Sequence, residues 1–122
     1  MTFAYWCILI AMFLPLVWAG VSKMGASDYD NSNPRVWIAK QEGRAQRANS
    51  AQQNSYEAFP PFAAAVVVAQ LTDPSQMTVD ILAGVFILMR IAYGIFYVTD
   101  KPVLRSSSWG IGFAMTIALF VT

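Results

Sequence analysis

The sequence has no histidine and a single cysteine, and each absence removes a class of function. Histidine is the commonest acid–base group near neutral pH and the commonest metal ligand, so we expect no metal site. A single cysteine, Cys7, excludes a disulfide within the chain. Because Cys7 lies inside an apolar run, we interpret it as a packing or lipid-facing thiol rather than a reactive one.

Charged residues are also scarce. They make up 12% of the 122 residues, whereas hydrophobic residues make up 57%. A soluble domain carries about a quarter charged residues, and one of this length keeps roughly a third of its unfolded surface in water. Too few polar residues are present to cover that surface, so we predict a single-domain integral membrane protein. The net charge of +1 gives no reason to expect nucleic acid as a partner.

The apolar segments predict an all-α membrane protein, a four-helix transmembrane bundle. The expected spans are about residues 2–22, 43–71, 77–98 and 105–122. The first is charge-free and long enough for a hydrocarbon core of about 30 Å. The alternative for it, a cleaved signal peptide, would have a basic start and a shorter apolar core.

Three further features bear on how the helices are built. Pro60-Pro61 lies where a polar half of the second span meets an apolar half, and predicts a kink. Gly110 and Gly112 in the fourth span predict a close approach between helices. Between the first two spans the polar segment 23–43 predicts a loop, in which Asn33-Pro34-Arg35 is a turn or the start of a helix and Trp37 is expected to anchor at the membrane surface.

Basic residues gather on one side of the predicted membrane. The first loop and the start of the second helix contain Lys23, Arg35, Lys40, Arg44 and Arg47, and the third loop contains Lys101 and Arg105. The positive-inside rule therefore predicts that loops one and three are cytoplasmic and that both termini lie outside.

Two stripes of polar residues lie within predicted membrane helices, where burying a charge in hydrocarbon is energetically costly. Helical spacing places each set on one face of its helix: Arg47, Ser50, Asn54 and Glu57 on the second, and Arg90, Tyr93 and Tyr97 on the third. An ionised arginine at mid-membrane costs at least about 2.5–3.5 kcal/mol and needs a partner. We therefore expect Arg90 to contact Glu57, within a protomer or across a subunit interface, with Asn54 placed to supply further hydrogen bonds.

Two interpretations of these stripes stay open. In the first they form a polar clamp that holds the helices together without a ligand. In the second they converge into a pocket on the cytoplasmic side, suited to a small, anionic, peptide-like molecule, because arginine offers a bidentate fork to a carboxylate. Arg105 is either an anchor in the headgroup region or a cation that stabilises a thiolate.

The spacing of these residues is similar to that of a known family. Their pattern resembles that of the membrane-associated proteins in eicosanoid and glutathione metabolism (MAPEG). On the second helix it consists of Arg47-Ala48 followed by Asn54-x-x-Glu57-x-x-Pro60. It continues with Arg90-x-x-Tyr93-x-x-x-Tyr97 and then Arg105-Ser106. The resemblance covers nearly the whole chain.

The resemblance implies a homotrimer in which glutathione lies at a subunit interface. It implies that Arg47, Asn54, Glu57, Arg90, Tyr93 and Tyr97 bind glutathione, while Arg105, with Ser106 beside it, stabilises the thiolate. The second substrate would be a lipophilic electrophile or peroxide drawn from the lipid.

The sequence also departs from the family pattern. Ser50 and Gln53 stand where eicosanoid-type members often have arginines, and Tyr93 stands where some members have histidine. These departures fit a bacterial branch, located in the inner membrane. They also keep an alternative open, a non-catalytic membrane scaffold or small-ligand-binding protein with the same fold. A channel or transporter is less favoured, because no span is broken as transporter helices are.

Overall fold

The computed structural model describes all residues 1–122 and contains five helices. They are α1 (Phe3–Lys23), α2 (Pro34–Ala39), α3 (Arg44–Leu71), α4 (Gln76–Val98) and α5 (Pro102–Val121). The all-helical fold is confirmed. Of the two outcomes expected for Asn33-Pro34-Arg35, a turn or a helix start, the structure has the helix start, with Pro34 as the first residue of the short α2.

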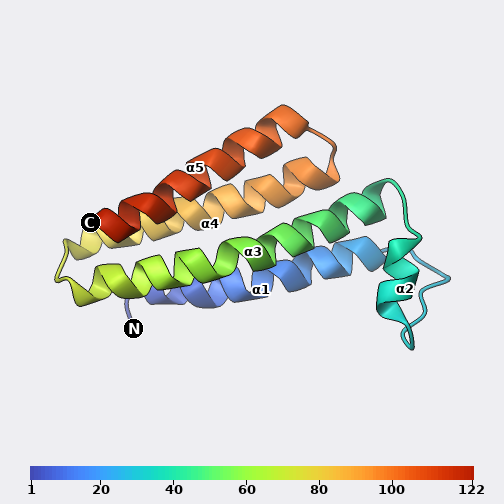
Figure 1. The fold of residues 1–122 in the computed structure, drawn as a ribbon, viewed down its shortest axis with the longest axis horizontal. Helices are drawn as coiled ribbons and strands as arrows, with labels where there is room; N and C mark the ends of the chain where they lie inside the picture. The colour runs from blue at the N-terminus through green and yellow to red at the C-terminus, as the bar shows by residue number, and fades with distance from the viewer.

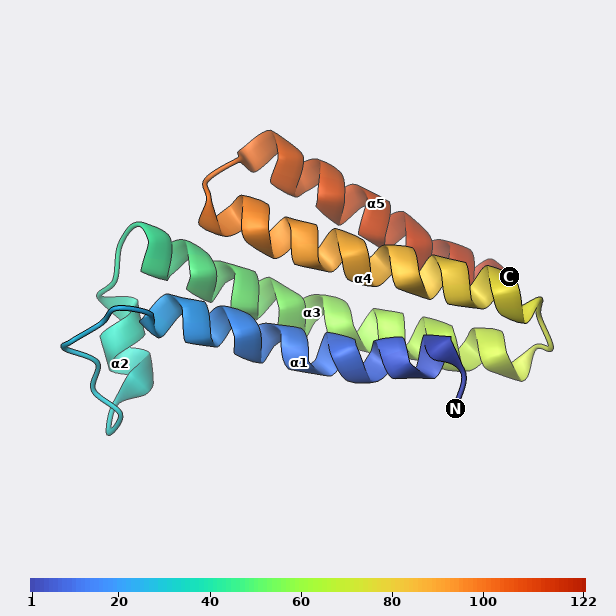
Figure 2. The same cartoon turned by 180° about the vertical axis from the view of Figure 1, so that it is seen from behind.

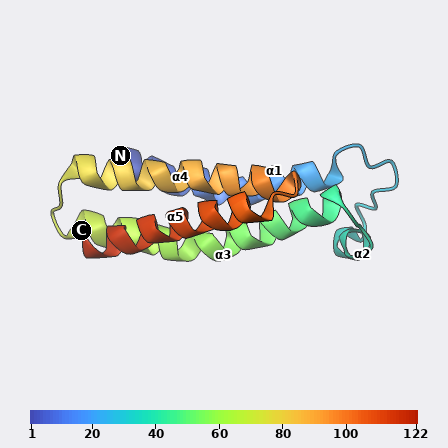
Figure 3. The same cartoon turned by 90° about the horizontal axis from the view of Figure 1, so that it is seen from above.

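The four long helices form an antiparallel bundle with two distinct ends (Figure 1). One end, here called the terminal end, holds both chain termini and the α3–α4 turn. The other, here called the loop end, holds α2 and the α4–α5 turn, as the view from above also shows (Figure 3). From the terminal end to the loop end, α5 leans progressively away from α3 (Figures 1 and 2).

Local sequence signals account for where the helices begin and end. The Thr2 hydroxyl accepts a hydrogen bond from the Tyr5 backbone N–H at the start of α1, and Ser75 caps α4 in the same way. Serine and threonine are favoured at this position because they satisfy free N–H groups of the first turn. Asp73 and Asp100 adopt positive φ angles of 54° and 60° in the two tight turns.

The core is built from small side chains and one aromatic stack. Alanines from α1, α3 and α4 dominate the buried cluster, which lets the backbones approach closely. Phe62 of α3 and Phe86 of α4 stack with ring centroids 3.8 Å apart. Cys7 is buried in the same cluster, in agreement with a packing role.

The closest helix contact is at a glycine that the sequence analysis did not select. Gly94 of α4 lies directly against the indole of Trp18 in α1, and a Cβ at this position would overlap that ring. Gly112 has ordinary packing distances, with its Cβ position 3.6 Å from the Cβ of Met89, while Gly110 has nothing within 4 Å. Among the glycines inside helices, Gly94 is therefore the one where a Cβ would overlap a neighbour, while Gly25 and Gly43 outside the helices have positive φ angles of 76° and 65°.

Three helices, α1, α4 and α5, are long and apolar enough to cross a membrane. The chain is an integral membrane protein on this basis. Helix α3 is different because its first half is polar, although it is continuous for 28 residues with Pro60 and Pro61 inside it. Both prolines lack an N–H, so the carbonyls four residues earlier, at Tyr56 and Glu57, lose their helical hydrogen bonds.

Candidate functional site

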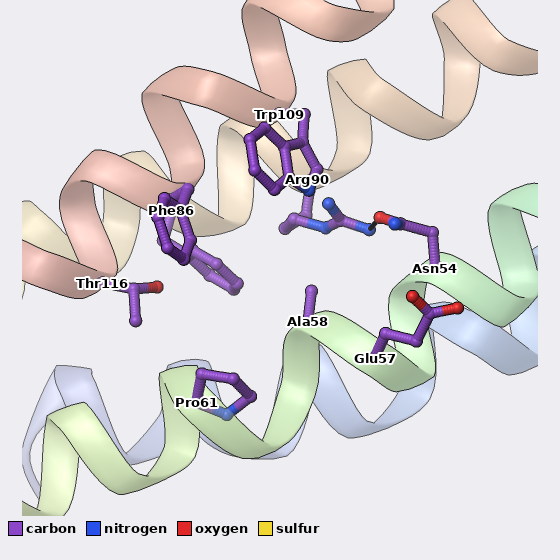
Figure 4. A pocket seen from close by; sticks show the side chains of 9 residues that line it. Asn54, Glu57, Ala58, Pro61, Phe86, Arg90, Trp109 and Thr116 are labelled. Atoms are coloured by element: carbon purple, nitrogen blue, oxygen red, sulfur yellow. Dashed lines mark hydrogen bonds between the residues drawn. The ribbon is translucent and has the colours of Figure 1, made fainter.

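A pocket of about 230 Å³ lies between α3, α4 and α5 (Figure 4). One side of it is polar and the other is apolar. Its lining residues are Asn54, Glu57, Ala58, Pro61, Phe86, Arg90, Trp109, Phe113 and Thr116. Three of the residues selected from the sequence therefore share one pocket.

Arg90 dominates the polar side of this pocket. Its side chain is only 3% exposed, and its Nη2 donates a 2.7 Å hydrogen bond to the Asn54 side-chain oxygen (Figure 4). The guanidinium also lies over the Tyr93 ring, with Cζ 4.3 Å from the ring centroid. A buried cation is thus held by an amide oxygen and an aromatic face, and it forms no ion pair.

The expected Arg90–Glu57 contact is not formed within the chain. Arg90 bonds instead to Asn54, one helical turn before Glu57, and no salt bridge joins the two charged groups. Glu57 is exposed and lines the same pocket. The carboxylate is therefore free to meet a ligand or a second subunit, which is the other arrangement that the sequence left open.

Aromatic contacts extend the Arg90 cluster towards α5. Tyr93 and Tyr97 pack edge to face with centroids 5.6 Å apart. The Arg105 guanidinium then lies over the Tyr97 ring, with Cζ 4.5 Å from its centroid. A continuous set of contacts thus runs from Asn54 on α3, through α4, to Arg105 in the first turn of α5.

Two of the predicted site residues lie outside this set. Arg47 donates two hydrogen bonds, of 3.2 and 3.1 Å, to the backbone carbonyl of Val98, which fixes the start of α3 against the end of α4. Ser106 is exposed in the first turn of α5 and makes no side-chain hydrogen bond within the chain. Neither residue lines the pocket of Figure 4.

The apolar side of the pocket was missed by the sequence analysis. Trp109 and Phe113 stack on α5 with centroids 5.2 Å apart, and Phe86 faces them from α4. Their signal in the sequence is the spacing of Trp109, Phe113 and Thr116, which places all three on one helix face. This face was not distinguishable from ordinary membrane-facing residues without knowing where α3 and α4 lie.

The geometry suits an amphiphilic ligand or a pair of ligands. Charged and amide groups at one side can bind carboxylates and amines, while the aromatic side can hold an apolar group. A family model described as the MAPEG family matches residues 3–122. The chain belongs to the MAPEG family. The match spans essentially the whole chain, which confirms the resemblance noted from the residues; no curated protein and no solved structure matches it.

Proposed function

We propose that this MAPEG protein binds glutathione in the pocket between α3, α4 and α5 and transfers it to a lipophilic electrophile. The observation that carries the proposal is the buried Arg90, bonded to Asn54 and facing a pocket that also contains a free carboxylate and an aromatic wall. A buried ionisable residue in a membrane helix marks a functional site by default.

The polar groups match the chemistry of a tripeptide with two carboxylates and one amine. The Arg90 guanidinium has N–H groups beyond the one donated to Asn54, and these can pair with a carboxylate. The free carboxylate of Glu57 can accept from the α-amino group. Tyr93 supplies a hydroxyl donor next to Arg90, and Tyr97 supplies one next to Arg105.

Arg105 is proposed to stabilise the glutathione thiolate. A free cysteine thiol has a pKa of about 8.5, and a neighbouring cation favours its ionised form. The thiolate sulfur then bonds to the electrophilic carbon, and the electron pair displaced leaves with a leaving group or takes up a proton from water. If the second substrate is a peroxide, a second glutathione completes the reduction as the disulfide.

The proposed site is completed by neighbouring copies, in a homotrimer. A pocket of about 230 Å³ in one chain is smaller than the roughly 300–1,000 Å³ usual for small-molecule sites. Glu57 and Gln53 are also exposed on α3 at a depth where lipid contact is costly. Covering this face with a second copy of the chain would both enlarge the pocket and remove these groups from lipid.

The proposed placement in the membrane uses α3 as the fourth span. Its apolar part, residues 59–71, extends only about 20 Å, which is short of a hydrocarbon core of about 30 Å. Crossing the membrane therefore brings Glu57 and Asn54 within it. The loop end carries Lys23, Arg35 and their basic neighbours, so we place it in the cytoplasm of a bacterial cell, in the inner membrane.

A second candidate is a non-catalytic membrane scaffold. The observation that favours it is that the cations are already engaged: Arg90 by Asn54 and Tyr93, and Arg105 by Tyr97. Ser50 and Gln53, which replace arginines of related proteins, also reduce the positive charge available to glutathione.

The two candidates are separated by measuring glutathione binding and thiolate formation in detergent-purified protein. Calorimetry reports the dissociation constant, and ultraviolet absorbance reports the thiolate. We expect binding at millimolar glutathione or below, and a thiolate signal that Arg105→Gln removes while affinity changes by less than about threefold. Lys101→Gln, which removes the same charge from the exposed α4–α5 turn, is the matched control and should retain the signal.

Absence of binding at millimolar glutathione would leave the scaffold candidate. Binding without a thiolate, or a thiolate that survives Arg105→Gln, would remove Arg105 from the chemistry. A positive result on both measurements justifies a screen of electrophiles and hydroperoxides, in which product formation identifies the second substrate.

A further inference from the structure

A shallow groove of about 600 Å³ lies at the terminal end, between the start of α1 and the first half of α4. Phe3 of α1 forms one wall, and α4 lines the rest from Met77 through Asp80 and Gly84 to Leu88. Helical spacing places these α4 residues on one face. The pocket of Figure 4 uses Phe86 and Arg90, on the opposite face of the same helix, so the two sites are separate.

Asp80 is the one charged residue in this groove. Its Oδ1 accepts two hydrogen bonds, from the Ala4 backbone N–H at 3.0 Å and from the Gln76 side chain at 2.8 Å. The Ala4 contact is made where the N-terminus lies beside the start of α4 (Figure 3). The Oδ2 atom accepts no hydrogen bond within the chain, and no cation forms an ion pair with it. One oxygen of the carboxylate is therefore free for a ligand.

The chain offers no basic side chain to balance this charge. Residues 1–22, 48–89 and 106–122, which include the terminal-end halves of all four long helices, contain no lysine or arginine. Asp80 is the fifth residue of α4, about 6 Å along the axis from the helix start, which is near the edge of the hydrocarbon. A charged residue at the membrane normally pairs with another group. The charge complement of Asp80 is therefore a cation from outside the chain.

The groove also has the length and the lining of a site for a lipid chain. From Met77 to Leu88, α4 rises about 16 Å, which is close to half of a hydrocarbon core of about 30 Å. Apart from Asp80 and Gly84, its lining residues are hydrophobic. Gly84 has no side chain to fill the floor, where its Cβ position is 3.2 Å from the Phe3 ring. An acyl chain can thus lie along α4, from Asp80 towards the middle of the membrane.

We infer that this groove binds a phospholipid with a primary ammonium headgroup, phosphatidylethanolamine. The ammonium donates a charge-assisted hydrogen bond to Asp80 Oδ2, and an acyl chain passes Gly84 towards Leu88. The trimethylated headgroup of phosphatidylcholine is also cationic, but it has no N–H to donate. An anionic headgroup is disfavoured, because it would meet a carboxylate and no basic side chain.

The test is lipid retention by the detergent-purified protein, measured by native mass spectrometry in an equal mixture of phosphatidylethanolamine and phosphatidylcholine with the same acyl chains. The charge variant is Asp80→Asn, which keeps an oxygen for Ala4 and Gln76 and replaces Oδ2 by an amide nitrogen. Its matched control is Asp73→Asn, which removes the same charge from the exposed α3–α4 turn, outside the groove. Asparagine tolerates the positive φ of 54° at that position.

A second pair of variants tests the groove independently of the charge. Gly84→Leu fills the floor of the groove with a side chain. Gly110→Leu adds the same side chain to α5, where nothing lies within 4 Å of the Cβ position. Retention of both phospholipids should fall about fivefold in Gly84→Leu and stay within about twofold in Gly110→Leu, because the added side chain excludes the acyl chain only in the groove.

We expect the unaltered protein to retain phosphatidylethanolamine about tenfold more strongly than phosphatidylcholine, which is the effect of one hydrogen bond to a charged group. Asp80→Asn should reduce this preference to within about twofold, while Asp73→Asn should keep it above about fivefold.

Three results would overturn the inference. The first is equal retention of the two lipids by the unaltered protein. The second is an equal loss of preference in Asp80→Asn and Asp73→Asn, which would indicate general surface charge. The third is dissociation of the oligomer in Gly84→Leu with both lipids still retained, which would identify a second copy of the chain as the occupant of the groove.

Discussion

The two ends of the bundle use different hydrogen bonds. At the terminal end side chains bond to one another: Thr2 donates to Gln70 at 2.7 Å, Gln70 and Gln76 exchange bonds, and Gln76 donates to Asp80 at 2.8 Å. Asp80 also accepts the Ala4 backbone N–H at 3.0 Å. At the loop end arginines bond to backbone carbonyls instead: Arg44 donates to Met24 at 2.9 Å, and Arg47 donates to Val98 at 3.2 and 3.1 Å.

This difference shows how each end is held together. A hydrogen bond with both partners present contributes about 1 kcal/mol net to stability. The terminal end closes α1, α3 and α4 together. Towards the loop end α5 leans away from α3 (Figure 1). The pocket that contains Arg90 and Asn54 lies midway along α3.

The largest expected effect comes from the close contact between Gly94 of α4 and Trp18 of α1, in the loop-end half of the bundle. Gly94→Ala would push a methyl group into the Trp18 ring and separate α1 from α4, so we expect a loss of about 3 kcal/mol in stability. Denaturant or thermal titration in detergent, followed by tryptophan fluorescence, measures it.

Gly110→Ala is the control for this prediction. It is also a helical glycine, but nothing lies within 4 Å of its Cβ position. Removing glycine's backbone freedom should therefore leave stability unchanged or raise it by about 0.5–1 kcal/mol. Similar losses in both variants would show that helix propensity, and not the contact with Trp18, is being measured.

The next effect concerns the partner of Arg90. Asn54→Leu leaves a buried guanidinium without its hydrogen bond, and we expect a cost of about 2–3 kcal/mol. A double-mutant cycle with Arg90→Met should give a coupling energy of about 1–2 kcal/mol with Asn54 and near zero with Glu57. Strong coupling to Glu57 in the intact oligomer would instead place that pair across a subunit interface.

Removing hydrogen bonds at the terminal end should lower stability somewhat less and leave glutathione affinity unchanged. Asp80→Ala removes the acceptor for both Ala4 and Gln76, and we expect a loss of about 1–2 kcal/mol. Asp80→Asn keeps an oxygen at that position and should cost less than half as much. If either variant weakens glutathione binding more than about twofold, the two ends are coupled and the comparison fails.

The smallest stability effects are expected at the two arginines beside the α4–α5 turn. Arg47→Gln removes two donors to the Val98 carbonyl and should cost about 1 kcal/mol, with glutathione affinity nearly unchanged. Arg105→Gln should change stability by less than about 0.5 kcal/mol, because its contact with Tyr97 is partly exposed. A loss of glutathione affinity in Arg47→Gln would show that Arg47 contributes to the ligand site.

Much of the architecture was predictable because membrane helices are marked by composition. The segments predicted as helices at 2–22, 43–71, 77–98 and 105–122 correspond to α1, α3, α4 and α5, with α5 beginning three residues earlier, at Pro102. Asn33-Pro34-Arg35 was expected to be a turn or a helix start, because six residues within a polar segment carry too short a pattern to decide between the two. Helix α2 forms where Trp37 packs inward against Tyr29.

The site was predicted in its composition and missed in its pairing. Helical spacing identified Asn54, Glu57 and Arg90 as residues that face a common space, and all three line one pocket. Spacing along a helix fixes direction around its axis and not the depth at which two helices meet. For that reason the sequence selected Glu57 as the partner of Arg90, one turn beyond Asn54.

By itself, the sequence determined that this chain is an all-helical membrane protein of the MAPEG family. The hydrocarbon core excludes charged side chains and unpaired backbone groups, so membrane helices appear in the sequence as long apolar segments. Only the tertiary structure decided the contacts between helices: Gly94 with Trp18, Arg47 with the Val98 carbonyl, and Asn54 rather than Glu57 as the hydrogen-bond partner of Arg90 within the chain. These depend on the register and tilt of packed helices, which arise from many side chains acting together and are not encoded in any one segment.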